Sequence, residues 1–211
     1  MPQRASAKKT RLAHVSLMCG EAFQRQAERL IPGIWAVKEG SSAIVMSDEL
    51  GDVVVCATNL AFALELYLKA LLTQLGLPVA QNHDLRVLYD GLPQSVRKLI
   101  EGVYDKALPD NVRRMDGHTS FVLAWGPLER PPFEDSKTWP ALPDVIARSR
   151  DLFQSWRYAF EFSPPNGSSY QFRQFEYCFL RCAAEVMRVE VSVRLSEAGM
   201  IPPLDSLTDQ Y

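Results

Sequence analysis

Two pairs of charged side chains lie inside stretches that are otherwise apolar, and these residues are the best placed to do chemistry. Glu65 and Lys69 are one helical turn apart within residues 59–72, and Arg157 and Glu161 have the same spacing. On a helix surface such a pair is an ordinary ion pair, worth roughly a few tenths of a kcal/mol. A buried charge is costly unless its partner and hydrogen bonds are in place. Because the neighbouring residues are nearly all apolar or aromatic, we expect both pairs to be partly buried.

His83 and Tyr158 extend this set. His83 stands at the start of a short predicted helix, where its ring either hydrogen-bonds a carboxylate or backbone carbonyl for structural reasons or joins the ion pairs around one polar pocket. Lys69 and Arg157 carry cations that suit a phosphate. The ring of Tyr158 can stack on a base, although rings at helical spacing more often belong to a core. The candidate ligand-binding residues are Glu65, Lys69, His83, Arg157, Tyr158 and Glu161.

The common catalytic motifs are absent from the sequence. It has no GxxxxGK[ST] phosphate loop, no GxGxxG segment after a strand, no HExxH and no GxSxG. The histidines at positions 14, 83 and 118 are too few for a multi-histidine metal site, and Cys178 and Cys182 have no further ligand at metal-binding spacing. We therefore expect no metal and no cofactor.

Composition indicates a globular protein of the cytoplasm. Lys and Arg number 23 against 25 Asp and Glu, so the net charge of −2 argues against a basic protein that coats nucleic acid. The hydrophobic fraction of 47% is too high for a disordered chain. The four cysteines form no CxxC pair, the first residues lack the apolar run of a signal peptide, and no apolar stretch is long enough to span a membrane. We expect reduced thiols and no membrane partner.

The spacing of apolar residues predicts an all-α fold that places these side chains. Residues recurring three and four apart predict helices over about 8–35, 48–75, 93–107, 143–162 and 169–198, with a short helix after Asn82. Gly76 and Gly199 are expected to end the second and the last of the long helices. The expected architecture is a single domain over residues 1–211, a bundle of four long helices plus one or two short ones.

Two segments stand apart from this pattern. Residues 109–143 hold six of the 14 prolines and predict a long irregular insertion, in which Thr119–Trp125 is compatible with a short strand. The tail over residues 200–211 is expected to be loose. The last helix carries two apolar stripes, and a helix apolar on two sides is either central in a bundle or shared with a partner subunit. A homodimer through the last helix is therefore predicted.

The segment from Asn59 to Leu92 resembles the HEPN family of small helical domains. That family has the pattern A-x-E-x-x-x-K-A-L-L, then G, then H-D-L-x-x-L on its second helix and the short helix that follows. Here the pattern reads Ala63 to Leu72, then Gly76, then His83 to Leu88. The string Trp156 to Glu161 is similar to segments before the last helix of some HEPN-like proteins. The resemblance covers residues 48–100 well and 150–198 in outline.

The resemblance implies a helical bundle, often dimeric, that is associated with nucleotides or RNA and occurs in toxin–antitoxin and phage-defence systems. Many members are metal-independent ribonucleases with an Arg and a His four to six residues apart at the start of the last helix. The His transfers a proton at the 2′-hydroxyl or leaving oxygen, and the Arg stabilises phosphate charge. The last helix here has arginines but no histidine. The one Arg-x4-His in the sequence, Arg113 with His118, is the candidate catalytic pair, and a solvated loop histidine is its alternative.

We therefore predict a HEPN-like protein that binds a nucleotide, RNA or a cognate partner protein without the usual ribonuclease site. The first alternative is a metal-independent endoribonuclease that uses Arg113 with His118, or recruits His83. The second is a structural homodimer.

Overall fold

The computed structural model describes residues 2–35, 47–114, 121–125, 139–157 and 171–202. Within them the chain forms four long helices, three short ones and two short strands. The long helices are α1 (Pro2–Trp35), α2 (Ser47–Gln74), α4 (Gln94–Arg114) and α7 (Tyr177–Glu197). The short elements are α3 (Leu85–Asp90), α5 (Leu142–Arg148), α6 (Leu152–Arg157), β1 (Phe121–Trp125) and β2 (Gln171–Phe175). The predicted helical bundle is confirmed, with a small sheet added to it.

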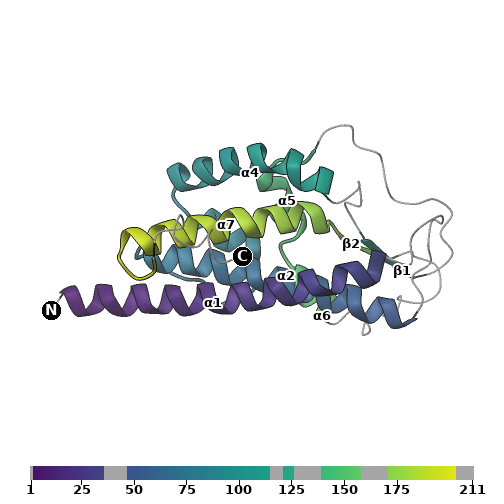
Figure 1. Cartoon of the computed structure of the whole chain (residues 1–211), viewed down its shortest axis with the longest axis horizontal. Coiled ribbons are helices and arrows are strands. Elements are labelled where there is room, and N and C mark those ends of the chain that lie inside the picture. The colour runs from purple at the N-terminus through teal and green to yellow at the C-terminus, as the bar shows by residue number, and fades with distance from the viewer. Residues whose placement is uncertain (1, 36–46, 115–120, 126–138, 158–170, 203–211) are drawn as a thin grey trace.

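The helix α2 is the central element of the bundle. It runs antiparallel to α1, α7 packs on both, and α4 lies on the far side of α7 (Figure 1). The short helices α3 and α6 also pack against α2. Because neighbours surround it, α2 is apolar on almost every side and contributes the largest share of the fully buried leucines. A charged side chain on the inner part of this helix must therefore find its partners inside the protein.

Two glycines end helices as their positions in the sequence predict. Gly76 follows α2 with a φ of 71°, and the amide of Leu77 donates to the carbonyl of Leu72 over 2.9 Å. Gly199 follows α7 with a φ of 68°, and the amide of Met200 donates to the carbonyl of Leu195. Glycine adopts the left-handed backbone conformation at little energetic cost. The turn that it makes lets the last carbonyls of the helix accept hydrogen bonds from amides beyond the helix.

The predicted helix over residues 143–162 is wrong, because the segment forms two short helices instead of one long one. α5 ends at Arg148 and α6 begins at Leu152. Between them the carbonyl of Arg150 accepts a hydrogen bond from the amide of Leu85 over 2.9 Å. A carbonyl turned toward another segment does not continue the helical ladder.

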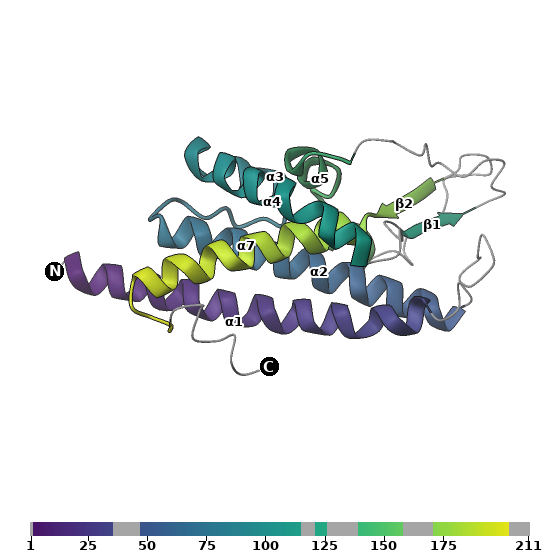
Figure 2. The ribbon, with the colours of Figure 1, turned by 45° about the horizontal axis from the view of Figure 1, so that its top comes forward.

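The last helix is also shorter than predicted, since it begins at Tyr177 and not near residue 169. Residues 171–175 form β2, which pairs antiparallel with β1 so that Phe121 faces Phe175 and Trp125 faces Gln171. Figure 2 shows this small sheet beyond the start of α7. The short strand that Thr119–Trp125 allows is thus present as β1. Phe172 and Phe175 are three apart, which suits a helix, but pairing with β1 decides the conformation.

The predicted irregular insertion over 109–143 is wrong at its beginning. Pro109 lies inside α4, which continues to Arg114. The proline removes one hydrogen bond of the helix. The carbonyl that loses this bond belongs to Asp105, and because Asp105 is exposed, water can solvate its backbone. Residues 115–120 and 126–138 of the insertion, and residues 203–211 of the predicted tail, lie outside the described residues.

Most side chains of α7, on both of its apolar stripes, are buried within the described part of the chain. α7 lies between α4 on one side and α1 with α2 on the other (Figure 1), and more than half of its side chains are buried. Packing inside the bundle therefore accounts for the two stripes. Dimerisation through this helix stays a prediction.

Among the residues that the structure describes, one helix is long and apolar enough to cross a membrane, judged by length and composition. It is the stretch Gly51–Gln74 of α2, with a mean hydropathy of 1.5 over its most apolar window. Of that window, 61% is buried inside the protein. The central helix of a bundle has the same composition, because its neighbours take the place of lipid.

Candidate polar site around Glu65 and His83

Glu65 is a charged residue almost completely buried on α2, with 1% of its surface exposed. Its carboxylate has two partners. Oε1 accepts from the Lys69 ammonium over 2.7 Å, and Oε2 lies 2.8 Å from Nδ1 of His83. The side chain of Lys69 is 23% exposed and that of His83 39% exposed, so the carboxylate lies at the bottom of the cluster and its partners reach the surface. The structure therefore brings together three of the six candidate residues.

The segment that carries His83 is fixed to the rest of the protein. Asp84 is the N-cap of α3, and its carboxylate accepts from the amides of Arg86 and Val87. The same carboxylate pairs with the Arg150 guanidinium, which approaches from the turn between α5 and α6. Burial raises the pKa of Asp84, but the hydrogen bonds and charge of Arg150 and the two amides together hold it below its ordinary value.

The ring of His83 also stacks on Phe153 of α6. The two ring centroids are 4.8 Å apart with 32° between the planes. Phe153 in turn lies 5.1 Å from Phe62 of α2, and Phe62 lies 4.7 Å from Phe23 of α1. A row of four rings thus joins three helices to the segment before α3. The stack restrains the plane of the imidazole, while Glu65 restrains one of its nitrogens.

Arg157 approaches this cluster at the end of α6. Its guanidinium carbon lies 5.7 Å from the centroid of Phe153, at the distance of a cation–π contact. The side chain is exposed. It therefore belongs to the same neighbourhood as His83 but does not contact Glu65 through any interaction that we observe. Tyr158 and Glu161 lie outside the described residues.

The predicted catalytic arginine is a surface residue of α4. The Arg113 guanidinium pairs with Asp110 one turn earlier and bonds the carbonyl of Pro109. Its side chain is 76% exposed. His118 lies outside the described residues, so the pairing of these two residues stays a prediction.

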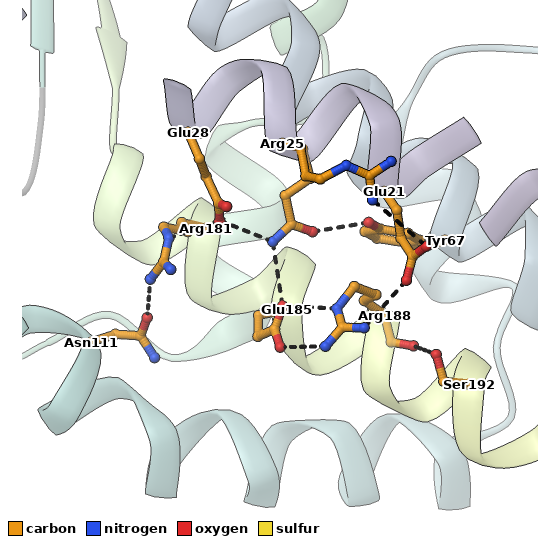
Figure 3. A network of polar contacts seen from close by, with 10 residues as sticks. Glu21, Arg25, Glu28, Tyr67, Asn111, Arg181, Glu185, Arg188 and Ser192 are labelled. Carbon is orange, nitrogen blue, oxygen red and sulfur yellow. Dashed lines mark hydrogen bonds and ion pairs between the residues drawn. The ribbon is translucent and has the colours of Figure 1, made fainter. Parts of the chain in front are cut away.

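A second polar network, which the sequence analysis missed, joins α1, α2 and α7 (Figure 3). At its centre the buried Gln24 accepts from the hydroxyl of Tyr67 over 2.9 Å and donates to Glu185 over 3.3 Å. Arg188 holds Glu185 with two hydrogen bonds, of 2.9 and 2.7 Å, and reaches Glu21 on α1 over 3.3 Å. The spacing of Glu185 and Arg188 is a sequence signal of a pair, but the partners on α1 are far away in the chain.

This second network extends to α4 through Arg181. The guanidinium donates to Glu28 of α1 over 3.0 Å and to Asn111 of α4 over 2.8 Å. Burial raises the pKa of Glu185, but Arg188, Gln24 and Arg181 together hold it below its ordinary value. Opposite charges on α1 and α7 satisfy one another, and neutral polar side chains of α2 and α4 add hydrogen bonds, which is the arrangement of a structural network.

Cys178 and Cys182 do not form a reactive or metal-binding site within the described residues. Burial raises the pKa of Cys178 to about 11 and that of Cys182 to about 12, although Arg181 lowers both. Thiols with such values remain protonated and behave as small apolar side chains. No group of three or more His, Cys, Asp or Glu side chains in this part of the chain could hold a metal ion.

The cluster around Glu65 offers a defined hydrogen-bonding pattern at the surface. Nδ1 of His83 lies 2.8 Å from the Glu65 carboxyl, so Nε2 is the ring nitrogen on the side away from Glu65. The ammonium of Lys69 and the guanidinium of Arg157 supply donors and positive charge near this ring. The arrangement can therefore hold an anion beside an imidazole nitrogen.

In comparisons with protein-family models, with curated proteins and with solved structures, the chain has no match. Function is therefore inferred from the side chains themselves, together with the motif resemblance.

Proposed function

We propose that this HEPN-like helical protein binds a nucleotide or RNA through the surface around Lys69, His83 and Arg157. The observation that supports the proposal is the buried carboxylate of Glu65, which fixes two surface side chains of different chemistry. A buried charge lowers stability relative to an apolar side chain of the same volume. Such an arrangement in an apolar helix is typical of residues held for function.

The charges near the site suit a phosphate. Lys69 has three N–H donors, and within the described residues only one of them is used, on Glu65. Arg157 is exposed, and its guanidinium is the second cation of this surface. Phosphate groups bound by such side chains displace counterions, which makes binding dependent on salt.

Binding of a fluorescent single-stranded RNA of about ten nucleotides, followed by anisotropy between about 50 and 200 mM salt, tests the proposal. We expect measurable binding by the intact protein. The variants Lys69→Met and Arg157→Gln should each weaken it about three- to tenfold and lower the salt slope by about one. Lys98→Ala is the matched control, because Lys98 is an exposed cation on α4. Loss of affinity in the control equal to that in the two site variants would contradict the proposal, as would absence of binding.

A second candidate, a metal-independent endoribonuclease, is favoured by the contact between His83 and Glu65. A carboxylate that orients an imidazole through Nδ1 leaves Nε2 as a base. Nε2 would take the proton of a 2′-hydroxyl, the 2′-oxygen would bond to the adjacent phosphorus, and the bond from phosphorus to the 5′-oxygen would break. The leaving 5′-oxygen takes a proton from water, and the imidazolium of His83 gives its proton to the hydroxide that results. The products are a 2′,3′-cyclic phosphate and a 5′-hydroxyl.

Cleavage of a single-stranded RNA in the presence of EDTA distinguishes this second candidate from binding alone. His83→Ala should abolish cleavage, and His118→Ala tests the pair that the sequence suggests. Cleavage that persists in both variants would exclude both histidines as the catalytic base.

A further inference from the structure

We propose that the outer face of α1 is a lipid-binding surface, through which the protein lies on a membrane leaflet that contains anionic lipids. The face is defined by exposed residues at spacings of three and four, and we call it the outer stripe: Lys8, Arg11, Val15, Met18, Ala22, Arg25 and Arg29. None of these residues belongs to the polar cluster around Glu65. The inference therefore stands whether or not that cluster binds RNA.

The outer stripe has an apolar centre between two positive ends. Val15 and Met18 in the centre are 51% and 56% exposed, and Leu12 beside them is 53% exposed. The positive ends are formed by exposed side chains before and after this centre: Lys8, Arg11, Arg25 and Arg29. At a rise of about 1.5 Å per residue, the stripe is about 32 Å long. It is thus a long, narrow surface that combines aliphatic contact with positive charge.

The acidic side chains in residues 8–30 of α1 turn toward α7 and away from the outer stripe (Figure 3). Glu21 pairs with Arg188 over 3.3 Å, and Glu28 pairs with Arg181 over 3.0 Å. Arg25 lies 4.0 Å from Glu21 at the edge of this network, and its side chain is still 61% exposed. Because the arginines of α7 take both carboxylates, the outer stripe is positive in a chain whose net charge is −2.

A second copy of the chain does not suit this face. Whether two copies run parallel or antiparallel, each positive end of one stripe meets a positive end of the other, and like charges repel. The apolar centre is also small, since three half-exposed side chains expose less surface than two whole ones. A standard protein interface takes about 20–30 residues from each side. The face therefore calls for a partner that is negatively charged and needs only a shallow apolar contact.

An anionic leaflet meets both conditions. The cations attract lipid headgroups, while the aliphatic side chains between them enter the boundary of headgroups and acyl chains to a depth of about 5–10 Å. α1 lies along one edge of the bundle, with α2 and α7 on its other side (Figures 1 and 2), so its outer face can meet a flat surface along its length. The prediction of no membrane partner considered spanning segments and signal peptides, and a surface contact requires neither.

Co-sedimentation with sucrose-loaded vesicles tests the inference on the native protein. We expect binding to phosphatidylcholine vesicles in which phosphatidylglycerol makes up about one third of the lipid, and no binding to vesicles of phosphatidylcholine alone. Raising the salt concentration from about 50 to 200 mM should weaken binding, because salt screens the attraction between cations and headgroups.

Variants then assign the binding to the outer stripe. Arg11→Gln and Arg29→Gln should each weaken binding about fivefold, the effect of one cation near an anionic surface. Met18→Gln should weaken it about three- to tenfold, because it removes an apolar side chain from the centre. The matched controls are Lys98→Gln and Leu99→Gln on α4, across α7 from α1 (Figure 1), and they should bind like the native protein. Circular dichroism checks that each variant is folded.

Four results would overturn the inference. The native protein could bind both kinds of vesicle equally, or neither. The α4 controls could lose as much affinity as the variants of the outer stripe. Met18→Gln could bind fully while Arg11→Gln binds weakly, which would show that the face reads charge alone, as it would on an acidic protein or a nucleic acid. Light scattering could show a native dimer that Met18→Gln converts to a monomer, which would place a second copy on the face. RNA binding is measured separately, so the proposed function stands or fails apart from these results.

Discussion

Glu65 shows how unevenly the members of one polar cluster affect stability. Its carboxylate is buried, while Lys69 and His83 reach the surface. Removing the carboxylate lets both partners turn toward water. Removing one partner leaves the buried charge with half of its hydrogen bonds. The energetic cost of a substitution therefore depends on which member is changed. Loss of a partner of the buried carboxylate is expected to cost more than loss of the carboxylate itself.

We predict that Lys69→Ala lowers the free energy of unfolding by about 2 kcal/mol, because Glu65 loses an opposite charge inside an apolar helix. Glu65→Leu should change it by less than about 1 kcal/mol, since leucine fits an apolar environment. Urea denaturation of the two variants beside the native protein measures both effects. A larger loss in Glu65→Leu than in Lys69→Ala would show that the carboxylate stabilises the fold outright.

The sequence predicts that Glu65, Lys69 and His83 lie close together, but it does not predict the ring contact that orients His83. One-turn spacing on an apolar helix indicates the first pair, and the short distance in sequence from α2 to the next helix limits where His83 can lie. The role of Phe153 could not be predicted, because an aromatic residue at helical spacing is usually a core residue. That it also orients a histidine depends on how α6 packs against α2.

The crossing of α1 and α2 depends on a single small residue. A Cβ on Gly20 of α1 would lie 2.5 Å from Cε1 of the Tyr67 ring on α2. The hydroxyl of the same tyrosine bonds Gln24, one turn farther along α1. This hydroxyl contact restrains the ring where a methyl group on Gly20 would meet it.

We predict that Gly20→Ala lowers the free energy of unfolding by about 1–3 kcal/mol, as expected for overpacking in a core. Gly102→Ala is the matched control, because Gly102 lies in the exposed face of α4 and its Cβ would have no neighbour within 4 Å. That change should raise stability by about 0.5–1 kcal/mol, because alanine favours a helix. Thermal denaturation followed by circular dichroism measures both. An equal gain in the two variants would show that the α1–α2 crossing can adjust.

The long helices could be predicted from spacing because apolar residues three and four apart describe one face of a helix. The errors fall where another segment decides the conformation. The amide of Leu85 bonds the carbonyl of Arg150 at the break between α5 and α6. The strand β1 pairs with residues that have helical spacing. These partners are distant in the sequence, so a local pattern carries no information about them.

Charges distributed over the whole molecule give it a characteristic dependence on pH. The pKa of Glu185 is lowered from its ordinary value of 4.5, and that of Glu176, before α7, is raised from the same value. Burial raises the pKa of Glu176 more than the nearby Arg148 lowers it. A lowered pKa contributes stability above the unfolded value, and this stability is lost as pH falls through the folded value. A raised pKa acts in the opposite direction, so stability falls as pH rises from 4.5 to the folded value.

We predict that Glu185→Gln destabilises the protein by about 1 kcal/mol at pH 7, a value reduced by solvent screening because its side chain is 40% exposed. The loss should disappear at a pH below the folded pKa of Glu185, where the native carboxyl is also uncharged. Glu176→Gln should be as stable as the native protein or more so at pH 7. Denaturant titrations at several pH values measure the difference. A deficit in Glu185→Gln that is independent of pH would show that charge is not its cause.

The tie between Asp84 and Arg150 joins segments 66 positions apart, and it fixes when the candidate site can come into existence. A chain growing on the ribosome completes α1 and α2 early, but His83 has no stacking partner until Phe153 has emerged and α6 has docked. The carboxylate of Glu65 therefore lacks an ordered surface above it until that stage of synthesis. Any capacity for binding at this site would arise only in nascent chains in which α6 has already been made and has docked.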